Sequence, residues 1–258
     1  MKQYIVDAFT NKIFSGNQAA VCVLKNWIED DLMQNIAAEN NLSETAFAVE
    51  KNDGYHLRWF TPAGEIDFCG HATLGAAFVI LNYYIKNTDS VKFFTQVGEI
   101  IVNRNNDMYE MNFPAYNLNK IAVTDKMTDA IGVKPIEAYL DRDLLLILDS
   151  QEAVENLKPN QEKMKQLDGL CVAVTAKDTK FDCISRVFAP ELDVAEDPVT
   201  GSTHCMIAPY WSDKLCKKDI VAFQASKRTG VLHCKITDDR VIISGNAVLY
   251  SIADILQF

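Results

Sequence analysis

Residues 58–75 read RWFTPAGEIDFCGHATLG, and residues 186–202 read RVFAPELDVAEDPVTGS. The second stretch is a blurred copy of the first: arginine, phenylalanine and proline recur 128 positions on (58 to 186), and threonine recurs 127 positions on (73 to 200). This period is far longer than the roughly 20 to 50 residues of solenoid and propeller units. The repeat therefore predicts two duplicated lobes that face each other across one site.

Composition limits the class of protein and the class of partner. The chain has 258 residues, 48% of them hydrophobic, which is enough to build a substantial core. A net charge of −10 argues against a nucleic-acid partner, because neutralising phosphates needs a basic face. It does not argue against a small anionic substrate, since backbone amides at helix starts bind carboxylates without any basic side chain.

The expected location is the cytoplasm. The first seven residues, MKQYIVD, lack the apolar core of a signal peptide, and no apolar run reaches membrane-spanning length. The seven cysteines form no CxxC pair and no ladder, which is typical of a reducing compartment. We therefore expect a cytoplasmic protein with no membrane partner.

Hydrophobic patterning predicts more strands than helices, which favours two α+β lobes over a doubly wound parallel sheet. The predicted helices are 29–40, 72–84 and 203–215, and the predicted strands are 4–9, 19–24, 45–49, 55–60, 170–174, 181–187, 219–225, 231–236 and 240–244. The polar stretch 116–120 is the expected crossing between lobes. It gives an N-terminal lobe at 1–115, to which residues 246–258 return, and a C-terminal lobe at 116–258.

Each copy of the repeat places a glycine-containing motif at the start of a helix, at residues 70–75 and 200–204. Helix starts carry unpaired N–H groups and a positive dipole end, so two such starts predict a clamp for one carboxylate. The alternative is that these residues only cap their helices. The occurrence of both motifs in the repeated unit favours a binding site.

Glu44 and His71 are the candidate proton-handling groups of the first lobe. Glu44 stands where the predicted helix gives way to an apolar strand, and partial desolvation there makes a carboxylate a stronger base. The alternative for Glu44 is a helix cap or a surface charge. His71 lies at the mouth of the glycine motif, where it could shuttle a proton or hydrogen-bond a carboxylate, although a lone histidine is more often structural.

Asp197 and Cys69 are further candidates. Asp197 either caps a turn or supplies a second proton-handling group from the other lobe. Cys69 is a candidate nucleophile, but residues 196–199 of the second copy hold no thiol to match it. We find no Walker loop, no GxGxxG, no HExxH and no zinc spacing, so the sequence predicts neither a cofactor nor a metal.

Several motifs together resemble the phenazine-biosynthesis PhzF-like proteins of the diaminopimelate epimerase-like superfamily. They span nearly the whole chain: DAFT (7–10), GNQAAV (16–21), SETAF (43–47), FTP (60–62), CGHAT (69–73), EDPVTGS (196–202) and QAS (224–226). Two positions depart from the family pattern. Gln18 stands where proline is usual, and Thr229 replaces the first glycine of a common Arg-Gly-Gly, so that residues 228–230 read Arg-Thr-Gly.

The resemblance implies two pseudo-symmetric lobes, each a curled sheet around a central helix, and a cofactor-independent isomerase that forms a homodimer. It implies that Glu44, His71 and Asp197 are catalytic. Ser43, Gly70, Gly201 and Ser202 would contact a small carboxylated substrate. The superfamily's two-cysteine racemases need a second thiol that this chain lacks.

Three hypotheses stay open at this stage. The first is an isomerase in which Glu44 moves a proton on a carbon acid. The second is a protein that binds small carboxylates without turnover. The third is catalysis by the single thiol of Cys69.

Overall fold

The computed structural model describes residues 1–192 and 194–256, and its chain divides into two compact units. One unit comprises Met1–Asn112 with Ser244–Phe258, and the other comprises Phe113–Ile243. The last strand, β17 (Arg240–Asp254), begins in the second unit and continues through the first. Residues 115–119 have no regular secondary structure.

The first unit is a closed sheet. Its strands are β1 (Lys2–Ala8), β2 (Asn17–Leu24), β3 (Glu44–Lys51), β4 (Gly54–Phe60), β5 (Glu65–Ile66), β6 (Ser90–Thr95), β7 (Gly98–Asn105), β8 (Met108–Pro114) and the end of β17. Strand β1 pairs with β17 and β2, and the pairing then passes from β2 through β3, β4, β6 and β7 to β8. Because β8 also pairs with β17, the sheet closes on itself.

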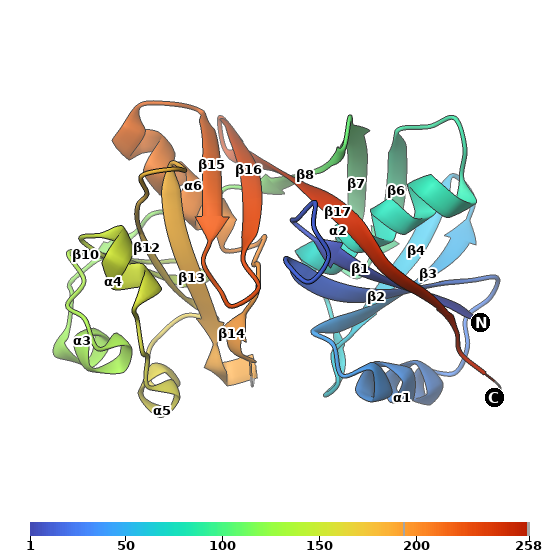
Figure 1. Ribbon diagram of the computed structural model, residues 1–258, viewed down its shortest axis with the longest axis horizontal. Coiled ribbons are helices and arrows are strands. Elements are labelled where there is room, and N and C mark those ends of the chain that lie inside the picture. The colour runs from blue at the N-terminus through green and yellow to red at the C-terminus, as the bar shows by residue number, and fades with distance from the viewer. Residues whose placement is uncertain (193, 257–258) are drawn as a thin grey trace. The chain divides into compact units, whose positions relative to one another are not determined.

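Helix α2 (Gly70–Val79) is the central helix of this unit, and Figure 1 shows it among β1, β2 and β17. All of its residues except Phe78 are buried, which is the pattern of an enclosed helix. A Cβ added at Gly75 would stand 3.5 Å from the Ala19 side chain, an ordinary van der Waals contact, so the helix lies against β2 at this point. The helix continues as a π-helical turn, Ile80–Tyr84, and together they confirm the helix predicted at 72–84.

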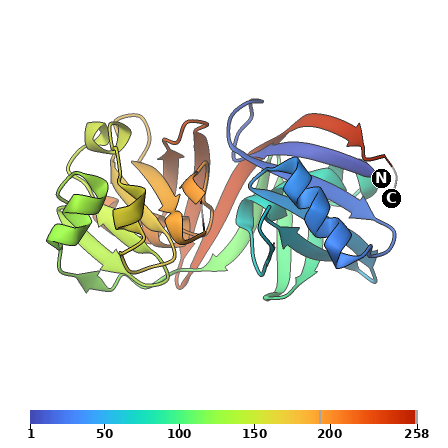
Figure 2. The ribbon, with the colours of Figure 1, turned by 90° about the horizontal axis from the view of Figure 1, so that it is seen from below.

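Helix α1 (Asp30–Asn40) lies against the same sheet, as Figure 2 shows. Met33, Ile36 and Ala37 pack there against Phe47 and other apolar side chains of β2, β3 and β4. The helix ends at Asn41, which takes a left-handed conformation with φ 47°. The chain can therefore turn within a few residues into β3, whose first residue is Glu44.

The second unit has its own sheet, helices and core. Its strands are β9 (Lys120–Ile121), β10 (Glu137–Leu140), β11 (Leu144–Ile147), β12 (Val172–Lys177), β13 (Cys183–Ala189), β14 (Val194–Asp197), β15 (Asp219–Gln224) and β16 (Gly230–Thr237). Its helices are α3 (Asp125–Ile131), α4 (Gln151–Glu155), α5 (Gln161–Met164), a 3₁₀ turn (Pro190–Leu192) and α6 (His204–Leu215).

Strand pairing confirms the duplication. In the first unit β2 and β3 are parallel, β3 and β4 antiparallel, β4 and β5 antiparallel, and β4 and β6 parallel. The second unit repeats this series with β11 and β12, β12 and β13, β13 and β14, and β13 and β15. Helices α2 and α6 occupy the same place in the two series. The predicted α+β fold of two similar lobes, each with a curled sheet and a central helix, is confirmed.

A repeated ion pair fixes the alignment of the two copies and corrects the one predicted from sequence. Arg58 binds both carboxylate oxygens of Glu65, and Arg186 binds both of Glu196. The arginines are 128 positions apart and the glutamates 131 (196 minus 65). The segment between the arginine and the glutamate is therefore three residues longer in the second copy than in the first. At this offset Thr200 corresponds to Cys69, so the predicted match with Thr73 was wrong. The sequence comparison matched two residues of the same type and did not detect the change in loop length.

Several predicted strands have different bounds in the structure. The strand predicted at 240–244 continues to Asp254, because its later residues pair with β1, from Ala247 opposite Ala8 to Asp254 opposite Lys2. The strand predicted at 181–187 begins at Cys183 and ends at Ala189. Within residues 1–192 and 194–256, no helix is long and apolar enough to cross a membrane.

Candidate active site

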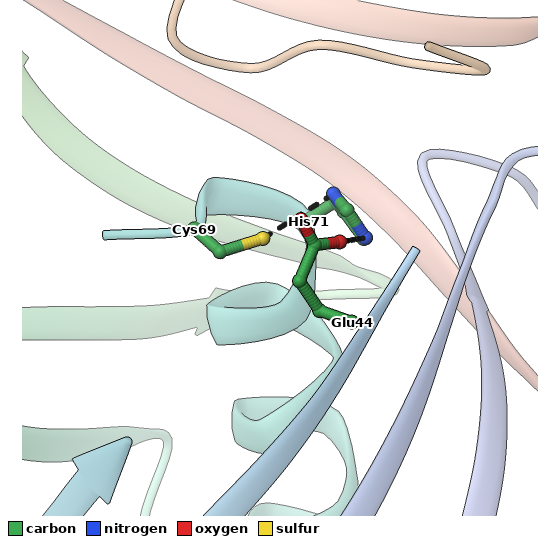
Figure 3. Close-up of side chains that lie close together, drawn as sticks. All are labelled: Glu44, Cys69 and His71. Carbon is green, nitrogen blue, oxygen red and sulfur yellow. Dashed lines mark hydrogen bonds and ion pairs between the residues drawn. The ribbon is translucent and has the colours of Figure 1, made fainter. Parts of the chain in front are cut away.

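Three elements of the first unit bring the polar side chains together. Asn17 opens β2 and Glu44 opens β3, and because these strands are parallel their starts lie at the same edge of the sheet. His71 is the second residue of α2, which packs against both strands. Figure 3 shows Glu44, Cys69 and His71 converging at this helix start.

Glu44 and His71 are in direct contact. Glu44 Oε2 lies 2.9 Å from His71 Nε2, and the side chains are 14% and 6% exposed. Oε2 and Nε2 are both fully buried, so the exposed part of the glutamate lies elsewhere on its side chain. The carboxyl group is thus anchored to the histidine through one oxygen while part of the side chain still reaches solvent.

The other ring nitrogen faces two further groups. Asn17 Nδ2 lies 3.1 Å from His71 Nδ1, and Cys69 Sγ lies 3.5 Å from the same nitrogen. The Ser43 hydroxyl donates to Asn17 Oδ1 at 3.2 Å. A chain of contacts therefore runs from Ser43 through Asn17 and His71 to Glu44.

Asn17 is a site residue that the sequence analysis missed. The signal was the glycine before it: Gly16 has φ 69°, and a Cβ there would lie 2.2 Å from the carbonyl oxygen of Ala8. Only glycine fits such a position, so the chain must turn there in one defined way. The residue that follows is consequently held in place at the start of β2.

Burial and neighbouring charge both shift the pKa values of His71 and Cys69. Burial by itself lowers the pKa of His71, whereas an ionised Cys69 and an ionised Glu44 raise it, and with both of them ionised that pKa lies well above 6.5. Burial is the main cause that raises the pKa of the Cys69 thiol to about 11, and the Glu44 carboxylate adds to the effect. At neutral pH Cys69 is therefore a thiol and a weak nucleophile.

The geometry fits proton transfer better than metal binding. One ligand atom each from Glu44, Cys69 and His71 lies within 4.8 Å of the other two. However, the two ring nitrogens of His71 face different neighbours, Glu44 at Nε2 and Cys69 at Nδ1. An ion shared by all three groups would have to break one of these contacts.

The start of α2 adds hydrogen-bond donors beside the cluster. Its N-cap residue, Cys69, makes no side-chain cap bond, and the first intrahelical backbone bond runs from the Thr73 amide to the Cys69 carbonyl. The amides of Gly70 and His71 precede that bond, so they have no acceptor within the helix. These donors and the helix dipole favour an anion at this position.

The second unit holds a related arrangement before α6. The Thr200 hydroxyl donates to Asp197 Oδ2, and the Thr200 amide donates to Gln224 Oε1 at 2.9 Å. Gln224 Nε2 in turn donates to the Asp197 carbonyl oxygen at 2.8 Å. Gln224 was not predicted as a site residue, although its place in the QAS motif was a signal. Asp197 is thus tied both to the helix start and to β15.

The turn at Gly201 and Ser202 leads into α6 through 3₁₀-type bonds, from the His204 amide to the Gly201 carbonyl and from the Cys205 amide to the Ser202 carbonyl. His204 Nδ1 lies 2.7 Å from the Thr200 carbonyl oxygen, just as the Thr73 hydroxyl bonds the Cys69 carbonyl in the first unit. Burial lowers the pKa of His204 to about 4, so this ring is neutral and structural.

The structure places the predicted residues in two groups. Ser43, Glu44, Gly70 and His71 lie together in the first unit. Asp197, Gly201 and Ser202 lie around the start of α6 in the second unit. Each predicted residue therefore lies at or beside a central-helix start of its own unit.

Comparison with known proteins identifies the chain. The family model described as phenazine biosynthesis-like protein (PhzC-PhzF) matches residues 6–252. The chain belongs to this PhzF family. A relative from Pseudomonas aeruginosa, named an uncharacterized isomerase, is 44% identical over 245 residues, which cover 95% of this chain and 95% of that protein.

Solved PhzF-family structures agree over the full length. The chain is 44% identical to a PhzF-family protein from Enterococcus faecalis, with a TM-score of 0.97 over 99% of each chain. It is 49% identical to a putative PhzC/PhzF protein from Clostridium difficile, with a TM-score of 0.95 over 100% of each chain. Since curated PhzF-family relatives are named isomerases, the chain is an enzyme of the isomerase type.

Proposed function

We propose that this PhzF-family protein moves a proton between carbon atoms of a small carboxylated substrate, with Glu44 as the general base and acid. The observation that supports this role is the 2.9 Å contact between Glu44 Oε2 and His71 Nε2. It anchors one carboxylate oxygen in the protein while 14% of the glutamate side chain stays exposed. A base held in this way has a fixed direction of approach.

The reaction balances without an oxidant or a cofactor. Glu44 takes a proton from a carbon α or vinylogous to an electron-withdrawing group, and the electron pair of the broken C–H bond moves into that group. The amides of Gly70 and His71 stabilise the negative charge that develops. Glu44 then returns the proton to another carbon, and the protein ends in its starting state.

The motif of the second unit has a proposed part as well. Asp197 is a second proton-handling carboxyl group, and the amides of Gly201 and Ser202 are donors for a substrate carboxylate. The bonds that tie Asp197 to Thr200 and Gln224 support a positioned side chain. Ser43 is the further polar contact of the first unit.

Two rival hypotheses predict different results. One-thiol catalysis needs an ionised Cys69, and a pKa of about 11 leaves little thiolate at neutral pH. A protein that binds carboxylates without turnover needs no base. The binding hypothesis therefore predicts carboxylate binding with no isotope exchange. Both rivals are tested by the experiment that tests Glu44.

The test is solvent deuterium exchange. Purified protein is incubated in D₂O with a panel of small carboxylates that carry an acidic C–H bond, and proton NMR follows the loss of that signal. We expect exchange in the wild type and in Glu50→Gln, an exposed glutamate of the same strand. Glu44→Gln should lower the rate at least about 100-fold, the usual scale of general-base catalysis. Exchange retained in folded Glu44→Gln would reject the base, and exchange lost in Cys69→Ala would favour the thiol.

A further inference from the structure

Asn17 and Ser43 lie next to the pair formed by Glu44 and His71. We propose that Asn17, held by Ser43, is a positioning residue that keeps His71 as the neutral tautomer with its proton on Nε2, so that Glu44 rests as an ionised base. The inference rests on the proposed role of Glu44. It concerns a feature of the substrate-free protein and can be measured without turnover.

The first step is the contact at Nδ1. Asn17 is fully buried, and its amide nitrogen lies 3.1 Å from His71 Nδ1. An amide nitrogen only donates, so Nδ1 must accept and carries no proton. A neutral imidazole carries one proton, which must then be on Nε2.

The second step is the orientation of the amide. The Ser43 hydroxyl donates to Asn17 Oδ1 at 3.2 Å, which occupies the oxygen and leaves the nitrogen to face the ring. Cys69 Sγ, 3.5 Å from Nδ1, is the second neighbour of that nitrogen. Because burial raises the pKa of Cys69 to about 11, it is a thiol at neutral pH, and its S–H group can donate to an unprotonated Nδ1.

The third step is the charge on the ring. Part of the upward shift in the pKa of His71 comes from Cys69, and that part requires a thiolate. At neutral pH the thiolate is absent, and the Glu44 carboxylate remains as the anion in contact with the ring, at Nε2. The carboxylate therefore holds the single ring proton on its own side, while the Asn17 donor opposes a second proton at Nδ1.

The consequence is a defined starting state for Glu44. With the proton on Nε2, the ring turns an N–H group toward the Glu44 side, which favours an ionised carboxylate that is ready to take a proton from carbon. With the proton on Nδ1, Nε2 would be an acceptor, and Glu44 would have to hold a proton to keep the 2.9 Å contact favourable. Asn17 thus decides whether Glu44 starts as a base or as an acid.

Nitrogen-15 NMR of histidine side chains in the substrate-free protein at pH 7 tests the inference, with His71→Gln identifying the His71 signals. We expect an unprotonated Nδ1 and a protonated Nε2 in the wild type. In Asn17→Asp the new carboxylate can only accept, so the Nδ1 signal should move to the protonated position. The matched control is Asn82→Asp, which lies in the same unit and bonds Phe78 and Tyr109. It should leave the His71 signals unchanged.

A second pair of variants keeps the test decisive if Asn17→Asp does not fold. Ser43→Ala frees the Asn17 oxygen, so the Nδ1 signal should move away from the unprotonated position, whereas Ser43→Thr keeps the hydroxyl and the wild-type signal. A protonated Nδ1 in the wild type would overturn the inference, and so would identical spectra for wild type, Asn17→Asp and Ser43→Ala. If the spectra are as expected and Glu44→Gln still exchanges deuterium, the proposed role of Glu44 as the base is rejected. The inference about the His71 tautomer is then still supported.

Discussion

Burial sets the chemistry of single residues in this protein, and Cys69 shows it most directly. Burial raises the pKa of its thiol to about 11, so iodoacetamide at pH 8 should modify the exposed Cys216 and leave Cys69 unmodified. The rate at Cys69 should rise as the pH approaches 11. Because a thiol in the unfolded chain ionises near pH 9.0, this group should also lower the free energy of unfolding as the pH rises from about 9 to 11.

Peptide mass spectrometry across a pH series measures both rates of modification in one sample. Denatured protein is the control, in which the two cysteines should react alike. Equal modification of Cys69 and Cys216 at pH 8 in the folded protein would contradict the prediction.

Backbone strain is a second effect at the residue scale. Thr229 has φ 57°, a left-handed conformation that costs a β-branched residue roughly 1–2 kcal/mol. Glycine removes this cost and loses roughly 0.5–1 kcal/mol in chain entropy. Thr229→Gly should therefore raise the free energy of unfolding by up to about 1 kcal/mol. Urea denaturation measures it, with Thr237→Gly in β16 as a control that should lose stability, and a loss in Thr229→Gly would refute the strain.

At the element scale, the repeated arginine joins a strand to the segment before each central helix. The Arg186 side chain is 13% exposed, and besides Glu196 it donates to the Leu157 carbonyl oxygen at 2.8 Å, just after α4. The Arg58 side chain is 23% exposed and bonds Glu65 and Asp30. Both guanidinium groups also lie over a phenylalanine ring, at 5.2 Å and 5.1 Å.

Arg186→Lys should lower the free energy of unfolding by about 2 kcal/mol, because lysine cannot make the two-point contact and leaves the Leu157 carbonyl unsatisfied. Arg58→Lys should cost less, since its second partner is the Asp30 carboxylate, which is 72% exposed, and not a carbonyl oxygen. Denaturant unfolding of the two variants side by side measures the difference. Equal losses would show that the carbonyl contact contributes nothing.

At the scale of the whole molecule, β17 makes the first unit depend on the end of the chain. Its residues pair along β1 and help to close the sheet, whereas the core of the second unit lies wholly within Phe113–Ile243. Truncation after Ile243 should therefore unfold the first unit and leave the second folded. Hydrogen exchange should show lost protection in β1–β3 and retained protection in β11–β13.

Truncation after Asp254 is the control, because it keeps every pair between β1 and β17 and should protect both units. Loss of protection in β11–β13 after truncation at Ile243 would mean that the second unit does not fold independently.

Some of the site could be predicted and some could not, for reasons that particular residues make plain. Glu44 and His71 lie in local patterns, a helix-to-strand junction and a glycine motif, so neighbouring residues in the chain indicated them as candidates. Asn17 acts through a contact with a residue 54 positions away, and no local pattern encodes that distance. Gln224 was missed for the same reason, since it binds Thr200 across 24 positions.

The sequence by itself determined the duplication, the α+β class and the residue types available for proton transfer, because these depend on periodicity and side-chain chemistry along the chain. The tertiary structure decided which of them meet. Parallel pairing of β2 with β3, and the packing of α2 against both, bring Asn17, Glu44 and His71 to one edge of the sheet. The tertiary structure also decided that Thr200 stands in the place of Cys69. Strand pairing and the repeated ion pair reveal the loop lengths, whereas a comparison of residue types along the chain does not.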